Sequence, residues 1–200
     1  MAFVRDTIDL NGCKLSFARG GKGTPLIYLH GTDGLAEWPA ILDTLAERFD
    51  VIAPDHPGFG ASEVPEWIDD VSDVAYLYLD AIEALGLSAV HVVGQSLGGW
   101  ITLEMAVRST QRLRSLTLIS AAGIHVKGVP KTDIFMIDPE EQARLAYADP
   151  KVGSLTGAMV EEMLKRCADG PADARVTKIT IAKEGGSVAP GFRVLDTRWR

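Results

Sequence analysis

The sequence predicts an α/β fold built on a mostly parallel, doubly wound sheet. Short apolar runs, typical of strands buried on both faces, recur over residues 26–119. Segments with an apolar side chain at every third or fourth position separate these runs and predict amphipathic helices. Such alternation implies right-handed crossovers, which place helices on both faces of a parallel sheet.

The first elements depart from that alternation. Two strand patterns flank the turn dipeptide Asn11-Gly12 and predict a hairpin, and residues 20–25 predict a loop. The expected strands, in chain order, are residues 3–10, 13–17, 26–29, 49–53, 89–93 and 113–119. The expected helices are residues 38–45, 71–85 and 97–107, and Gly86 ends the second of them.

The alternation of strands and helices stops after Gly123. Residues 138–141 combine an N-cap aspartate, a first-turn proline and an acid, which together start a helix. An apolar stripe over residues 160–167 predicts another helix without an intervening strand. We therefore expect a core over residues 1–124, a helical lid insertion over 125–183 and an irregular tail over 184–200.

The composition excludes several classes of protein. The 200 residues are 46% hydrophobic and 24% charged, as in globular domains that bury a sizeable core. A net charge of −7 argues against nucleic-acid binding, and two distant cysteines form neither a disulfide framework nor a metal site. No ligand cluster implies a metal or organic cofactor. Because no apolar run resembles a signal peptide or a membrane span, we expect a cytoplasmic protein.

The strongest chemical signal is a G-x-S-x-G pattern formed by Gly94, Ser96 and Gly98. An expected strand runs into it and an expected helix runs out, which is the context of a nucleophile on a tight turn. Small residues two before and two after the serine let that turn close. The sequence therefore predicts Ser96 as a catalytic nucleophile, with the helix N-terminus stabilising negative charge beside it.

A second signal follows the strand expected at residues 26–29. Gly31 and Thr32 stand where ligand sites form in open α/β sheets, at the carboxyl end of the strand. Thr32 is expected to offer its backbone N–H to an oxyanion, and Leu97, directly after the nucleophile, to offer a second. We expect His30 itself to be a packed structural histidine.

These motifs together resemble those of the α/β-hydrolase superfamily. They occur in the same order along the chain, and on the same strands and turns, as in that superfamily. The three segments are Leu-His-Gly-Thr-Asp-Gly (29–34), Asp-His-Pro-Gly-Phe-Gly-Ala-Ser (55–62) and Gly-Gln-Ser-Leu-Gly-Gly (94–99). The resemblance covers residues 1–123 and is to lidded members with a serine nucleophile. It implies a hydrolase that cleaves an ester or a related carbonyl (C–C) bond through an acyl-enzyme at Ser96.

The sequence departs from that family's pattern after the lid. The family orders its triad as serine, then acid, then histidine. Of the four histidines only His125 follows Ser96, and its candidate orienting acids are Asp133 and Asp138. The family's C-terminal strands and the loops that carry its acid and histidine are not recognisable, so we expect impaired activity in this chain.

Three interpretations follow from this departure. The chain is a serine hydrolase whose C-terminal part is truncated or replaced, a ligand-binding pseudoenzyme, or a subunit that another chain completes. The resemblance implies a small-molecule ester or ketone substrate, and an apolar run at residues 134–137 indicates that this substrate has an apolar part. Without a further strand, the strand expected at residues 113–119 would be an exposed sheet edge through which copies self-associate.

Overall fold

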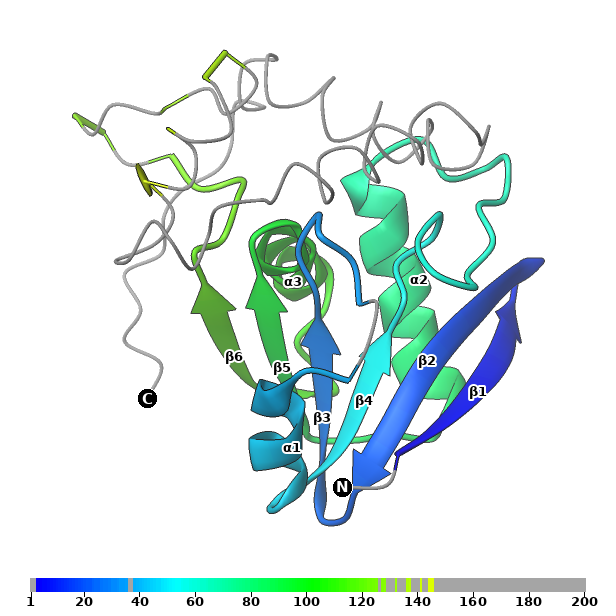
Figure 1. The fold of residues 1–200 in the computed structure, drawn as a ribbon. Helices are drawn as coiled ribbons and strands as arrows, with labels where there is room; N and C mark the ends of the chain where they lie inside the picture. Colours follow the sequence, from blue (N-terminus) through cyan, green and yellow to red (C-terminus); the bar gives the residue numbers. More distant parts are fainter. Residues whose placement is uncertain are drawn as a thin grey trace.

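The computed structural model describes residues 3–35 and 38–125, with eight single residues beyond them (127, 128, 132, 136, 137, 141, 144 and 145). One six-stranded sheet has the order β1-β2-β4-β3-β5-β6 (Figure 1). Its strands are β1 (Phe3–Leu10), β2 (Cys13–Gly21), β3 (Thr24–Leu29), β4 (Phe49–Pro54), β5 (Val90–Gln95) and β6 (Leu113–Ile119). The helices are α1 (Ala40–Ala46), α2 (Val71–Ala84) and α3 (Leu97–Arg108).

The sheet is mixed, with a parallel centre. β4, β3, β5 and β6 run parallel to one another, whereas β1 pairs with β2 and β2 pairs with β4 in antiparallel fashion. Asn11 and Gly12 join β1 to β2 with φ angles of 55° and 77°. Two consecutive positive φ angles are what a tight two-residue hairpin turn requires, so the predicted hairpin is confirmed.

Helices cover both faces of the sheet, as expected for a doubly wound fold. α1 packs on one face through Leu42 and Ala46, and α2 and α3 pack on the other (Figure 1). Strand β3 shows why both faces are apolar. Leu26 contributes to the α1 side and its neighbour Ile27 to the α2–α3 side, because successive side chains point to opposite faces.

Helix α2 has sequence-encoded ends. The Asp70 carboxylate accepts from the backbone N–H groups of Ser72 (2.6 Å) and Asp73 (3.3 Å), and the Asp73 carboxylate accepts from the N–H of Asp70 (3.1 Å). This reciprocal capping box satisfies donors that the helix cannot. Gly86, with φ 64°, follows the last turn, which confirms the predicted end.

Several strand boundaries differ from the prediction. β2 continues to Gly21 and β3 begins at Thr24, so most of the expected loop over residues 20–25 is strand. The reason is the ladder to β4, in which Gly21 pairs with Asp50. Arg19, on the same stretch, forms an ion pair with Asp50. β5 also runs on to Gln95, two residues past its expected end.

Strand β6 ends the described part of the sheet. No strand among the described residues pairs with its outer edge, and all of its side chains are exposed or only partly buried. The residues expected to form the second lid helix and the tail, 160–167 and 184–200, lie outside the described residues. Within the described part, no helix has both the length and the apolar character of a membrane span.

Candidate active site

Ser96 occupies the turn between β5 and α3, with φ 49° and ψ −111°. A side chain in this region costs on the order of 1–3 kcal/mol, so the surrounding structure must enforce it. The backbone N–H of Ser96 donates to Ile119 (2.9 Å), and its carbonyl oxygen accepts from Ala122 (3.0 Å). The chain leaving β6 therefore holds the turn. Ser96 is the N-cap of α3, yet its hydroxyl makes no capping bond.

The glycines on either side of Ser96 sit where a side chain could not fit. A Cβ on Gly94 would lie 2.4 Å from the carbonyl oxygen of Gly98. A Cβ on Gly98 would lie 2.1 Å from the carbonyl oxygen of Leu29, at the end of β3. This close approach brings the start of α3 against the carboxyl ends of β3 and β5, where the Ser96 turn stands.

The Gly31–Thr32 segment lies beside the serine. A Cβ built on Gly31 would be 3.3 Å from the Cβ and 3.9 Å from the Oγ of Ser96. The backbone N–H of Gly98 donates to the carbonyl oxygen of His30 (3.0 Å). Leu97 is the first residue of α3, where a backbone N–H has no intrahelical acceptor. The structure thus brings together the two segments that carry the predicted oxyanion donors.

A buried hydrogen-bonded group lies behind the Gly31–Thr32 segment. The ring of His30 contacts the carbonyl oxygen of Gly31 through Nδ1 (2.6 Å), and its Nε2 accepts from the backbone N–H of His56 (3.0 Å). His56 contacts the carbonyl oxygen of His30 through Nε2 (2.9 Å) and the hydroxyl of Tyr78 through Nδ1 (2.5 Å). We call this group, His30, His56 and Tyr78, the histidine relay.

Burial keeps both relay histidines neutral. Desolvation lowers the pKa of His30 from 6.5 to about 4. The pKa of His56 is lowered well below 6.5, mainly by desolvation and to a smaller extent by the nearby His30. The expectation that His30 is a packed structural histidine fits its exposure of 2%. Sequence reasoning missed His56 and Tyr78, whose only sequence signal was the place of His56 in the 55–62 motif.

The loop after β4 is fixed by a buried aspartate. Asp55 is fully buried and forms an ion pair with Arg5 of β1 (2.9 Å). A Cβ on Gly60 would lie 2.4 Å from the Asp55 carboxylate, so the loop can fold over this group only with glycine there. Asp55 and Gly60 therefore support the loop that presents His56.

The described structure does not join His125, the predicted base, to Ser96. His125 is exposed, and among the described residues no hydrogen bond links it to Ser96. Asp133 and Asp138, its candidate acids, lie outside the described residues. His91 lies in β5 and contacts the Ser115 hydroxyl through Nδ1 (2.7 Å).

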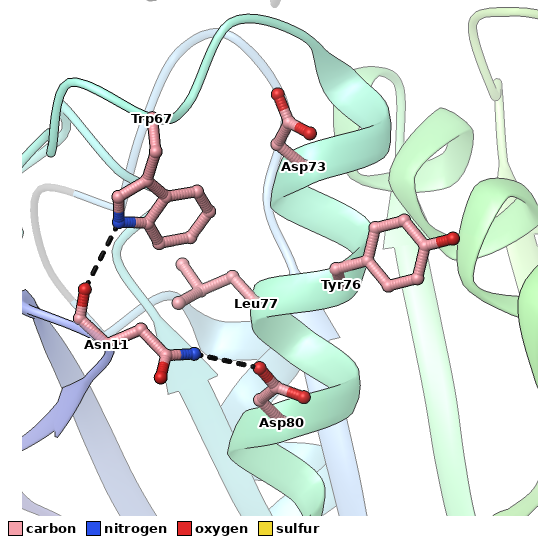
Figure 2. Close-up of a pocket in the computed structure, with 6 residues that line it drawn as sticks. All are labelled: Asn11, Trp67, Asp73, Tyr76, Leu77 and Asp80. Carbon is pink, nitrogen blue, oxygen red and sulfur yellow. Dashed lines mark hydrogen bonds between the residues drawn. The ribbon is translucent and has the colours of Figure 1, made fainter.

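A pocket of about 320 Å³ lies apart from Ser96, between the hairpin turn and α2 (Figure 2). The Trp67 indole donates to the carbonyl oxygen of Asn11 (3.2 Å), and the Asn11 amide donates to Asp80 (3.1 Å). These two bonds join Trp67, Asn11 and Asp80 of the pocket lining. No group of three or more histidine, cysteine, aspartate or glutamate side chains among the described residues could hold a metal.

A family model and two curated proteins match this chain over more than half of its length. A family model described as the alpha/beta hydrolase fold matches residues 24–149. The chain is 34% identical, over 58% of its length and 31% of the relative's, to the dihydrolipoyllysine-residue acetyltransferase component of the acetoin cleaving system of Cupriavidus necator. It is 35% identical, over 56% of its length and 42% of the relative's, to 2-hydroxymuconate semialdehyde hydrolase of a Pseudomonas species.

A solved structure shares the fold. Haloalkane dehalogenase from Bradyrhizobium elkani superposes with a TM-score of 0.56 at 24% identity, over 60% of this chain and 42% of that one. At this identity the likeness concerns the fold alone. The chain spans less than half the length of either curated relative.

Proposed function

Because the chain belongs to the α/β-hydrolase fold family, we propose that it carries the nucleophile of a serine hydrolase acting on an ester or a related carbonyl (C–C) bond. The observation that supports this most directly is the backbone of Ser96, with φ 49° and ψ −111° between β5 and α3. A strained turn of this kind lifts a serine hydroxyl above the sheet.

The proposed reaction begins with attack of the Ser96 hydroxyl oxygen on the carbonyl carbon. The resulting oxyanion accepts hydrogen bonds from the backbone N–H groups of Thr32 and Leu97, and the N-terminus of α3 adds a favourable field. Collapse of the tetrahedral intermediate expels the leaving group, which takes up the proton that the Ser96 hydroxyl loses, and leaves an acyl-enzyme, which water then hydrolyses.

Turnover by the 200-residue chain is expected to be slow. A serine hydroxyl is a poor nucleophile at neutral pH without a base, and His125 is the only histidine after Ser96. The apolar run at residues 134–137 supports a substrate with an apolar part. The name of the Pseudomonas relative, a semialdehyde hydrolase, supports a carbonyl compound as the substrate class.

Acetylation by p-nitrophenyl acetate tests the proposal. We expect slow transfer of one acetyl group to Ser96, located by peptide mass spectrometry, and no such adduct in Ser96→Ala. Ser120→Ala is the matched control, because Ser120 also has a positive φ (45°) but follows β6. Circular dichroism verifies that each variant is folded.

The outcomes separate the interpretations. Acetylation spread over lysines, with none on Ser96, would contradict the nucleophile assignment. Binding of an acyl ligand without any Ser96 adduct would favour the pseudoenzyme. A fast rate that is lost in His125→Ala would make His125 the base and contradict the expected impairment.

A further inference from the structure

The direction of every hydrogen bond in the histidine relay can be assigned. The carbonyl oxygen of His30 can only accept, so Nε2 of His56 carries the hydrogen. Nδ1 of His56 is then an acceptor, and the Tyr78 hydroxyl donates to it. Nε2 of His30 accepts from the N–H of His56, which leaves the hydrogen of His30 on Nδ1, donated to Gly31.

The last of these bonds acts on the predicted oxyanion donor. The carbonyl group of Gly31 and the N–H of Thr32 belong to one peptide unit, and the described peptide bonds are all trans. In a planar trans peptide the carbonyl oxygen and the amide hydrogen point in opposite directions. A bond that holds the Gly31 oxygen toward the His30 ring therefore turns the Thr32 N–H away from that ring.

The preceding peptide is held from two sides. The carbonyl oxygen of His30 accepts from His56 Nε2 (2.9 Å) and from the backbone N–H of Gly98 (3.0 Å). These two bonds use both lone pairs of that oxygen. Gly98 lies two residues after Ser96, so the same carbonyl ties the relay to the nucleophile turn.

We propose that Tyr78, His56 and His30 act as positioning residues that orient the Thr32 N–H toward the oxyanion formed at Ser96. The role in catalysis depends on the proposed function, whereas the orientation of the Thr32 peptide does not. Tyr78 lies on α2, and no described hydrogen bond joins it to Ser96. It therefore acts through its hydrogen bond to His56. The relay thus extends the site from the carboxyl ends of the strands to a helix that covers the sheet.

The tautomers provide a test that needs no variant. In protein labelled with ¹⁵N-histidine at pH 7, we expect His56 protonated on Nε2 and His30 protonated on Nδ1. The opposite tautomer on either ring would break the assigned chain of donors and overturn the proposal.

Tyr78→Phe removes one hydroxyl and leaves the ring in place. Tyr76→Phe is the matched control, because Tyr76 is on the same helix but 54% exposed. We expect Tyr78→Phe to shift the Thr32 amide resonance and to slow acetylation of Ser96 about tenfold, which is milder than the ~10²–10³-fold effect of removing a donor altogether. Tyr76→Phe should change neither.

The Thr32 amide resonance and the rate of Ser96 acetylation test the relay and the proposed function separately. A shifted Thr32 amide in a chain that never acetylates Ser96 would support the orientation and contradict the proposed function. Acetylation of Ser96 at equal rates in Tyr78→Phe and Tyr76→Phe, with the Thr32 amide unchanged, would overturn the relay and leave the nucleophile in place.

Discussion

The backbone N–H of Gly98 donates to the carbonyl oxygen of His30 at 3.0 Å, and this bond joins the Ser96 turn to the Thr32 segment. It forms only because Gly98 has no side chain, since a Cβ there would lie 2.1 Å from the Leu29 carbonyl oxygen. The two halves of the candidate site therefore depend on a single close approach of α3 to β3.

Gly98→Ala is expected to lower the free energy of unfolding by at least about 3 kcal/mol, because backbone atoms must move to relieve the contact. Chemical denaturation measures the loss. Gly86→Ala is the control, since Gly86 has φ 64° but open space around its Cβ position, and we expect it to cost only about 1–2 kcal/mol. Equal losses in the two variants would contradict the close-contact argument.

Ser96→Gly is expected to raise the free energy of unfolding by about 1 kcal/mol. Glycine adopts φ 49° and ψ −111° without the strain of a side chain, and this gain exceeds its additional chain entropy. Ser96→Ala also removes the hydroxyl but keeps a Cβ, so it should melt close to the unsubstituted chain. A Ser96→Gly variant that melts below Ser96→Ala would show that the turn stores no strain.

Stability is expected to fall as the pH drops from 6.5 toward 4. Burial lowers the pKa of His30 from 6.5 to about 4, so in this range the unfolded chain binds a proton that the folded chain does not. That difference costs the folded state about 3 kcal/mol by pH 4. His56, whose pKa is also lowered by burial, contributes in the same direction.

Denaturation at a series of pH values measures this dependence. The amide of His30→Asn can still donate toward Gly31. In this variant the free energy of unfolding should depend less steeply on pH between 6.5 and 4, by the equivalent of about one bound proton. A slope that is the same in His30→Asn and in the unsubstituted chain would contradict the assignment.

Local patterns allowed most of the fold and the turn at Ser96 to be predicted. The strand patterns, the Asn11-Gly12 turn and the spacing of Gly94, Ser96 and Gly98 each act within a few residues of sequence. The histidine relay could not be predicted, because its three members come from separate elements. His56 meets His30 only because β4 lies beside β3 in the sheet, and this order follows from topology and not from local pattern.

The same limit applies to the extension of β2. Residues 18–21 lack a clear alternation of apolar and polar side chains, and only their pairing with β4 makes them a strand. The sequence identified Ser96, the Gly31–Thr32 segment and the small residues that let the Ser96 turn close, whereas the partners of His30 lie on elements that only the sheet order brings beside it.

The outer edge of β6 is expected to mediate self-association. Leu118 is 37% exposed on this strand, and no described strand pairs beyond it. An apolar strand with an unpaired edge recruits other chains, and a lysine on such a strand prevents this. We therefore expect the chain to self-associate as its concentration rises and Leu118→Lys to shift the equilibrium toward the monomer, as followed by size-exclusion chromatography. Val107→Lys places the same charge on α3, at a side chain that is 70% exposed, and should leave the equilibrium unchanged. A chain that stays monomeric at every concentration and melts cooperatively would contradict an exposed edge, and an equal response to both lysines would point to net charge as the cause.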